Sequence, residues 1–176
     1  MRDIDFFLMW QEWRSERVAD MKAAYGKSCP VFPPDPRWVV TATYEPYPQP
    51  RQEVVGTAAG VPRPVPVHGV LRFSLDGTQC TLEPYSSGPP GCLNVAFRDA
   101  TSGGKSYPAA RVVFPEVPRH GESTTVIDFN RAINPPCAFS PWASCAFPPA
   151  GNTMLVAVEA GEMAPELLTG TGLGIG

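Results

Sequence analysis

The sequence predicts a mainly β fold, a single antiparallel β-barrel-like or sandwich domain of about eight short strands with an N-terminal amphipathic helix. Its 176 residues are the length of one domain that can bury a sizeable core. The 22 prolines and 16 glycines interrupt the chain too often for a helix bundle. Short β-type runs alternate with these turn-forming residues, which favours antiparallel strands.

An amphipathic helix is predicted over residues 4–25, where apolar residues recur at close to helical spacing and charged residues fill most of the other face. The apolar set is Phe6, Trp10, Trp13, Met21 and Ala24. Gly26 follows directly and suits a left-handed cap that ends a helix. Two tryptophans on one stripe are compatible with a ligand platform, but the favoured interpretation is packing of the helix against the β-core.

Strands are expected along the rest of the chain, after a stiff proline-rich connector at 30–36. Prolines 46, 48 and 50 predict a turn after the first strand, with a short strand at Val54 and Val55 to follow. Asp76-Gly77 between two alternating runs is the clearest hairpin signal. The β-type runs lie at 38–44, 67–75, 78–83, 92–97, 107–114, 126–129 and 154–158. We expect one domain over 1–168 and a flexible glycine-rich tail over 169–176.

Composition and charge bear on partners and location. The net charge of −3, without a Lys/Arg-rich run, gives no electrostatic reason to expect nucleic acid or an anionic membrane surface. No apolar run approaches the roughly 20 residues that a membrane-spanning helix needs, and the first residues do not resemble a signal peptide. The odd number of cysteines, five, suits free thiols in a reducing cytoplasm. We therefore expect a cytoplasmic protein.

Polar residues concentrate between 124 and 162, where a β-type run leads into a proline-broken loop. Asp128, Asn130, Arg131 and Asn134 follow the strand at 126–129. Strand alternation would place Asp128 and Asn130 on one face, opposite Ile127 and Phe129. These polar residues either line a cavity or bond the backbone of a turn, and the cluster by itself favours neither role.

Cys137 and Cys145 lie in the same loop, with seven residues between them. Zinc sites use close cysteine pairs with two further ligands, so no metal is expected here. A disulfide is sterically possible but disfavoured by a reducing compartment. A nucleophilic Cys137 would need a nearby cation or base, whereas most buried cysteines only fill the core.

The carboxylates to examine for proton transfer are Asp99, Asp128, Glu159 and Glu162, because a partly buried acid beside an amide can act as a base at neutral pH. Exposed carboxylates at strand ends are far commoner. The sequence contains no Ser-His-Asp order, no G-x-S-x-G elbow and no phosphate-binding glycine loop, and no cofactor is expected.

Several motifs together resemble a known family. They are D-F-N-R-A-I-N-P-P-C-A-F-S-P-W-A-S-C-A-F-P-P-A-G-N at 128–152, V-E-A-G-E at 158–162, F-R-D-A-T-S-G-G-K-S-Y-P-A-A-R at 97–111 and V-F-P-P-D-P-R-W-V-V-T-A at 31–42. The chain is similar in these motifs to the bacterial and archaeal family labelled domain of unknown function sixteen-eighty-four. The resemblance implies a small β-rich domain and no established activity.

The resemblance also implies a set of marked positions: Asp99, Thr101, Tyr107, Arg111, Asp128, Asn130, Arg131, Asn134, Cys137, Cys145, Asn152, Glu159 and Glu162. This chain departs from the family pattern where Ile133 replaces a usual tyrosine and Met163 a usual lysine. Loss of a hydroxyl and an ammonium group implies a less polar pocket, and we expect a more apolar ligand.

These inferences lead to a cofactor-independent enzyme that does general acid/base chemistry, such as cyclisation, isomerisation or hydrolysis, on a hydrophobic metabolite. Asp128 or Glu162 would act as the base, and Arg131 would stabilise developing negative charge. The expected substrate-binding residues are Asn130, Asn134, Cys137, Trp142, Asn152, Tyr107 and Arg111. The alternative is a non-catalytic module that binds a small ligand or has a regulatory role.

Overall fold

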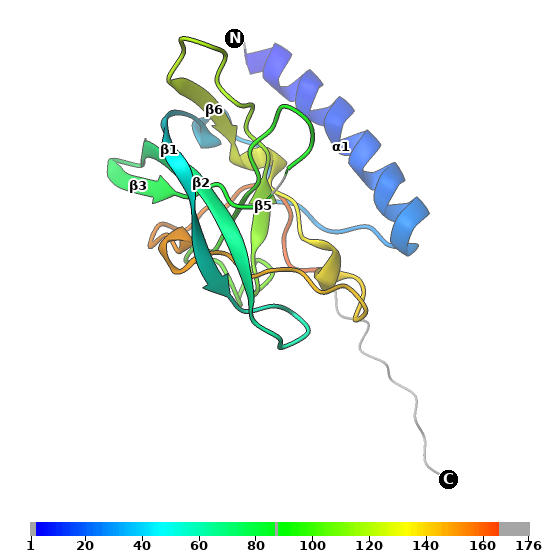
Figure 1. Ribbon diagram of the computed structural model, residues 1–176. Coiled ribbons are helices and arrows are strands. Elements are labelled where there is room, and N and C mark those ends of the chain that lie inside the picture. The colour runs from blue at the N-terminus through cyan, green and yellow to red at the C-terminus, as the bar shows by residue number, and fades with distance from the viewer. Residues whose placement is uncertain (1–2, 87, 166–176) are drawn as a thin grey trace.

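The computed structural model describes residues 3–86 and 88–165 (Figure 1). Helix α1 spans Asp3–Tyr25 and precedes all the strands. The strands are β1 Val39–Val55, β2 Arg63–Leu75, β3 Thr78–Leu82, β4 Val95–Phe97, β5 Arg111–Val113 and β6 Thr124–Asp128. Short 3-10 turns lie at Pro36–Trp38, Phe129–Arg131, Pro136–Ala138 and Ala150–Asn152. The fold is mainly β with one N-terminal helix.

The strands form two antiparallel sheets. One has the order β3-β2-β1-β6, and the other pairs β4 with β5. The larger sheet has β3 and β6 at its edges and does not close on itself, so the described residues form no closed barrel. They contain six strands, fewer than the expected eight. The tail expected over 169–176 lies outside the described residues.

The proline-rich stretch expected to be a turn is part of a long strand. β1 continues to Val55. Its pairing with β2 shifts in register between Pro46 and Arg51 and then resumes, so the prolines lie where the ladder is irregular. Proline lacks an N–H group to donate to a ladder, and such an irregularity accommodates it within a strand. The backbone of β1 also approaches β2 closely, since a Cβ on Gly69 would lie 2.5 Å from the carbonyl oxygen of Glu45. The separate short strand expected at Val54 and Val55 is therefore the end of β1.

The Asp76-Gly77 hairpin is confirmed. Leu75 pairs with Thr78, and the two residues between them have φ of 47° and 76°. Positive φ at both central positions defines the turn that matches the twist of paired strands.

The prediction of a strand at 154–158 is wrong. This segment is irregular, and its backbone bonds to Arg98 and to the Asp99 side chain.

The main core lies between the sheets and the segment around Val158. Its buried side chains include Trp38, Leu71, Phe73, Leu82, Phe97, Ile127, Phe129 and Val158. The ring of Phe129 lies 5.8 Å from that of Phe73 and 5.3 Å from that of Phe97. Ile127 and Phe129, which strand alternation placed on one face, are both fully buried, and Asn130 is buried as well.

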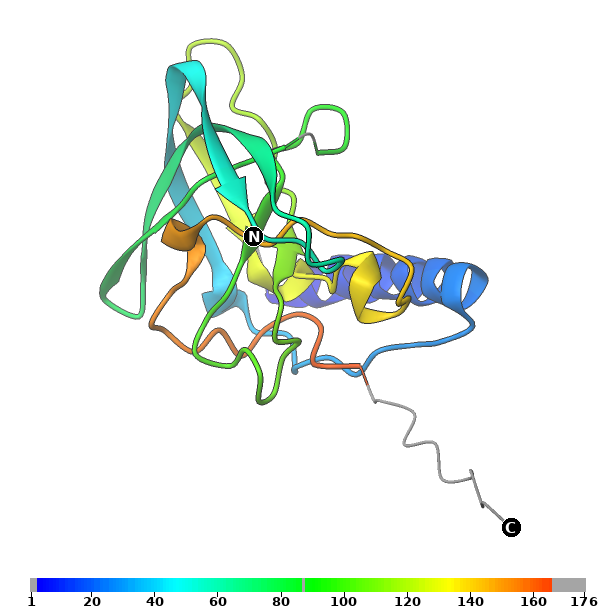
Figure 2. The ribbon, with the colours of Figure 1, turned by 60° about the horizontal axis from the view of Figure 1, so that its bottom comes forward.

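Helix α1 lies outside the strands, along one side of them (Figures 1 and 2). It buries Phe6 and Met21, and the indole N–H of Trp10 donates to the carbonyl of Asn130 at 3.2 Å. Gly26 has φ of 65° and its N–H bonds the carbonyl of Lys22, as a helix-ending cap requires. The predicted N-terminal helix is confirmed, and Met21 and Tyr25 near its end pack on Cys29, Ala138 and Phe139 of the loops rather than on the main core. Within the described residues, no helix is both long and apolar enough to cross a membrane.

Candidate functional site

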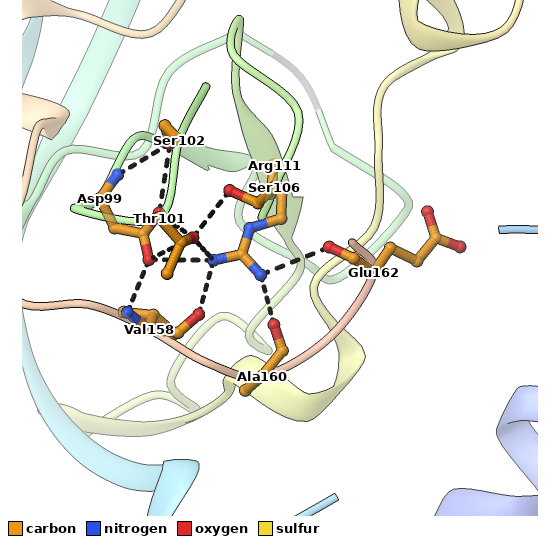
Figure 3. A network of polar contacts seen from close by, with 8 residues as sticks. All are labelled: Asp99, Thr101, Ser102, Ser106, Arg111, Val158, Ala160 and Glu162. Atoms are coloured by element: carbon orange, nitrogen blue, oxygen red, sulfur yellow. Dashed lines mark hydrogen bonds and ion pairs between the residues drawn. The ribbon is translucent and has the colours of Figure 1, made fainter. Parts of the chain in front are cut away.

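Arg111 on β5 forms the centre of a buried polar network (Figure 3). Its guanidinium lies 3.0 Å from the Asp99 carboxylate and donates to the carbonyls of Val158 and Ala160. The side chains of Arg111 and Asp99 are 1% and 0% exposed. Thr101 bonds the same carboxylate at 2.9 Å. Burial lowers the pKa of Arg111, and the Asp99 charge opposes that shift. Arg111 therefore holds the irregular 158–162 segment in place and lines neither of the cavities described below.

Glu162 lies in a second buried cluster, and its carboxylate points away from Arg111 (Figure 3). The side chain is 0% exposed, and the carboxylate accepts from Arg17 at 2.9 Å and from the Asn134 N–H at 2.7 Å. Arg14 lies 3.6 Å away. Since all these partners are charged groups or backbone and neither cavity reaches it, Glu162 links α1 to the 134 region. The assignment of Glu162 as a catalytic base is not retained.

Three asparagines expected to bind substrate are buried and bond the backbone. Asn130 exchanges hydrogen bonds with the backbone of Asp35, at 2.9 and 3.0 Å. Asn152 accepts from the N–H of Glu83 and donates to its carbonyl. The amide of Asn134 donates to the carbonyl of Met163, and its oxygen has no hydrogen-bond partner. These amides join segments that lie far apart in the sequence, although Asn134 also reaches a cavity wall.

Asp128 and Arg131 line a groove of about 710 Å³ between α1 and the segment 113–128. Asp128 ends β6 and caps the following 3-10 turn by accepting from the Asn130 N–H at 3.0 Å. Its other oxygen lies 3.3 Å from Arg131, which also lies over the ring of Trp13. Burial raises the pKa of Asp128, while bonding to Asn130 and the Arg131 charge oppose the shift. This carboxylate is thus the predicted base that does border a cavity.

A separate cavity of about 520 Å³ contains both loop cysteines and is called the cysteine pocket below. It is bordered by the end of α1, the start of β2, β4, β5 and the 133–147 segment. The lining residues include Arg17, Tyr25, Arg63, Tyr85, Asn94, Ala96, Ala110, Val112, Phe114, Ile133, Asn134, Cys137, Cys145, Ala146 and Phe147. No aspartate or glutamate of the described residues lines it. Sequence reasoning did not identify Arg17, Arg63, Tyr85 or Phe147, because no motif links them.

The two cysteines of the pocket interact. The backbone N–H of Cys137 donates to the sulfur of Cys145 at 3.3 Å, and both thiols are free and half-buried. A hydrogen bond from the Cys137 thiol lowers the pKa of Cys145 to about 6, and the Cys137 N–H and the Arg63 charge act in the same direction. The same thiol–thiol bond, together with burial, raises the pKa of Cys137. Cys145 is therefore the more acidic of the two thiols, and Cys137 holds its proton more strongly.

The other expected binding residues lie elsewhere. Trp142 is 92% exposed and lines neither cavity. Tyr107 is not part of the pocket lining, but its hydroxyl donates to the carbonyl of Cys137 at 3.1 Å, and burial raises its pKa to about 12. Glu159 bonds Lys105 at the surface. Among the described residues no three His, Cys, Asp or Glu side chains gather as a metal site would require.

The fold has a counterpart among solved structures. The solution NMR structure of an uncharacterized protein of Haloarcula marismortui matches with a TM-score of 0.70 and 27% sequence identity, over 92% of this chain and 95% of that chain. A comparison with curated proteins found no match. The model of one family, described as a protein of unknown function (DUF1684), matches residues 26–163. Since that match spans most of the sequence, the chain belongs to the DUF1684 family.

Proposed function

We propose that the protein binds a small, largely apolar metabolite with an anionic end in the cysteine pocket. The pocket volume of about 520 Å³ lies within the range of small-molecule sites, which are mostly apolar with a few polar groups. Its walls come from both sheets, with Arg63 from β2, Ala96 from β4 and Val112 from β5.

The charges of the lining carry this proposal. Its two cationic side chains are Arg17 and Arg63, and it has no carboxylate within the described residues. Arg17 is neutralised by Glu162 at 2.9 Å. Arg63 is exposed, and its side chain makes no hydrogen bond or ion pair with any described residue. A carboxylate or sulfonate on a ligand would supply that missing partner.

The Cys145 thiolate is the negative group in the lining, and it feels the charge of Arg63. It competes with an anionic ligand for this cation. The affinity for anions is therefore highest when Cys145 is uncharged. Apolar walls at Val112, Ile133 and Phe147 would hold the rest of the ligand.

Titration with straight-chain alkyl carboxylates and sulfonates tests the proposal, with the alcohols and ammonium ions of the same chain length as controls. We expect the anions to bind and to raise the melting temperature, and the ammonium ions not to bind. Arg63→Ala is expected to weaken anion binding about tenfold, the low end for a charge-assisted hydrogen bond.

Arg72→Ala is the matched control, since Arg72 lies on the same strand, is exposed and is outside the pocket. It should leave anion binding unchanged. Equal binding of alcohols and anions, or equal loss in both arginine variants, would refute anion recognition by Arg63.

The second candidate is the cofactor-independent acid/base enzyme, with cyclisation, isomerisation or hydrolysis as its reaction. One observation favours it: Asp128, with a raised pKa, borders a groove beside the cationic Arg131. The groove and the cysteine pocket share Arg17, Phe114 and Ile133 as walls. Any turnover found with a pocket ligand should fall at least a hundredfold in Asp128→Asn. Unchanged turnover in that variant would remove Asp128 from the chemistry.

A further inference from the structure

The cysteine pair has a geometry that goes beyond ligand binding. The Cys145 sulfur lies 3.3 Å from the backbone nitrogen of Cys137. The Cys137 side chain also interacts directly with the Cys145 thiol, so the two thiols lie side by side. The 3-10 turn Pro136–Ala138 fixes the backbone of Cys137 at this place. This sulfur–nitrogen contact brings the two residues to about the Cα separation that a disulfide spans, up to about 7 Å, and rotation about the Cα–Cβ bonds can turn the two sulfurs toward each other.

The pair is also accessible, whereas two of the other cysteines are not. Cys137 and Cys145 line the cysteine pocket, so a small reagent that enters it reaches both sulfurs. Cys29 and Cys80 are buried, and burial raises the pKa of both thiols. Cys92 is half-buried but lies outside the lining of both cavities. Reaction of thiols with small reagents is therefore expected at Cys137 and Cys145.

The electrostatics assign different roles to the two sulfurs. The Cys145 sulfur accepts from the Cys137 N–H and thiol and feels Arg63, and its pKa is lowered to about 6. At pH 7 most of Cys145 is thiolate, which is the nucleophilic form of a cysteine. Cys137 keeps its proton and stands beside the atom that would be oxidised.

We propose that Cys137 and Cys145 form a reversible redox site in the wall of the cysteine pocket, with Cys145 as the attacking and Cys137 as the resolving cysteine. In the first step the Cys145 thiolate attacks one oxygen of a hydroperoxide. The O–O bond breaks, Cys145 becomes a sulfenic acid, and the second oxygen leaves as hydroxide or alkoxide.

In the second step the Cys137 sulfur attacks the Cys145 sulfenic sulfur, the S–S bond forms and water leaves. An external dithiol returns the pair to its reduced form by thiol–disulfide exchange. In a reducing cytoplasm, the predicted compartment, the pair would rest as the dithiol. This inference does not depend on the pocket ligand.

Peptide mapping of the reduced full-length protein after treatment with hydrogen peroxide tests the proposal. No lysine or arginine follows Arg131, so trypsin leaves both cysteines in one peptide, and chymotryptic cleavage after Trp142 separates them. We expect a disulfide that joins these two fragments and disappears on addition of dithiothreitol. A different cysteine pair, cross-linking between molecules, or no disulfide would overturn the proposal.

The pH dependence of alkylation identifies the attacking sulfur. With a pKa near 6, the rate at Cys145 should fall only about tenfold between pH 8 and pH 5, whereas an ordinary thiol loses several hundredfold. If the alkylation rate at Cys145 falls several hundredfold over this range, Cys145 is an ordinary thiol and its role as the attacking cysteine is overturned. This measurement needs no variant, so it does not depend on whether a variant folds.

Variants separate the two roles. In Cys137→Ser, peroxide should leave a Cys145 sulfenic acid that dimedone traps, and in Cys145→Ser no dimedone adduct should form at Cys137. Cys92→Ser is the matched control for a half-buried cysteine outside the pocket, and it should form the disulfide as the wild type does. A dimedone adduct at Cys137 in Cys145→Ser, at the rate seen for Cys145, would refute the assignment.

Discussion

Replacement of Arg111 by methionine tests whether the buried network holds the fold together. The variant keeps a long apolar side chain but leaves the Asp99 carboxylate, 0% exposed, without its cation. Removal of one partner from a buried ion pair costs about 3–5 kcal/mol, and the carbonyls of Val158 and Ala160 lose a donor as well. We therefore expect the free energy of unfolding to fall by about 4 kcal/mol.

The assay is urea unfolding followed by tryptophan fluorescence, together with thermal unfolding. For a chain of this length, a loss of about 4 kcal/mol corresponds to a melting temperature lower by about 8–16 °C. Arg37→Met is the matched control, because the pair of Arg37 with Asp35 is 55% and 44% exposed. Arg37→Met should lower the free energy of unfolding by less than about 0.5 kcal/mol.

A double variant examines the reason for the loss. Asp99→Asn combined with Arg111→Met removes the stranded charge, so it should be more stable than the sum of the two single variants implies. A loss below about 1 kcal/mol in Arg111→Met would refute the assigned role of Arg111. Full additivity of the two substitutions would refute the stranded carboxylate as the cause.

Four further predictions follow from the other described features. Glu162→Gln should lower the free energy of unfolding by about 2–4 kcal/mol, because Arg17 would lose its buried anion, and urea unfolding of the variant would show it. The raised pKa of Asp128 means that its stabilising contribution is present below about pH 4 and lost as pH rises through the folded-state pKa. Asp128→Asn should therefore flatten the pH dependence of unfolding above about pH 4, and parallel slopes for variant and wild type would contradict this. Trp142→Ala should change neither stability beyond about 0.5 kcal/mol nor anion binding, since the side chain is 92% exposed; weaker binding in a ligand titration would return Trp142 to the site. Peroxide oxidation should strengthen anion binding several-fold by removing the Cys145 thiolate charge, and titrations before and after dithiothreitol would measure it.

Local signals in the sequence accounted for several elements. The helix spacing followed by Gly26 predicted α1, and Asp76-Gly77 predicted the β2–β3 hairpin, because each depends on residues a few positions apart. Strand alternation placed Ile127 and Phe129 on one face, and the packed structure buries both of them. The prolines of β1 were wrongly predicted to form a turn. An irregularity in the pairing of β1 with β2 accommodates them, and that pairing is not visible in the local sequence.

The candidate site was predicted in part. The segment 124–162 contains Asp128, Arg131, Cys137 and Cys145, which do border cavities. Glu162 belongs to the same segment but is buried by Arg17, a residue 145 positions away. Polar residues that bind a ligand and polar residues that satisfy a buried partner look alike in a sequence, because the difference lies in what surrounds them.

The sequence by itself determined the β-rich class, the N-terminal helix, the tight hairpin and the family, since these follow from local propensity and from motif. Tertiary structure decided which of the polar residues face a cavity. It placed Arg63 and Val112 beside Cys145, and it turned the apolar run at 154–158 into an irregular segment held by Arg111 and Asp99. The physical reason is that burial, ion pairing and the pKa of Cys145 depend on groups far apart in the chain, which only the packed fold brings together.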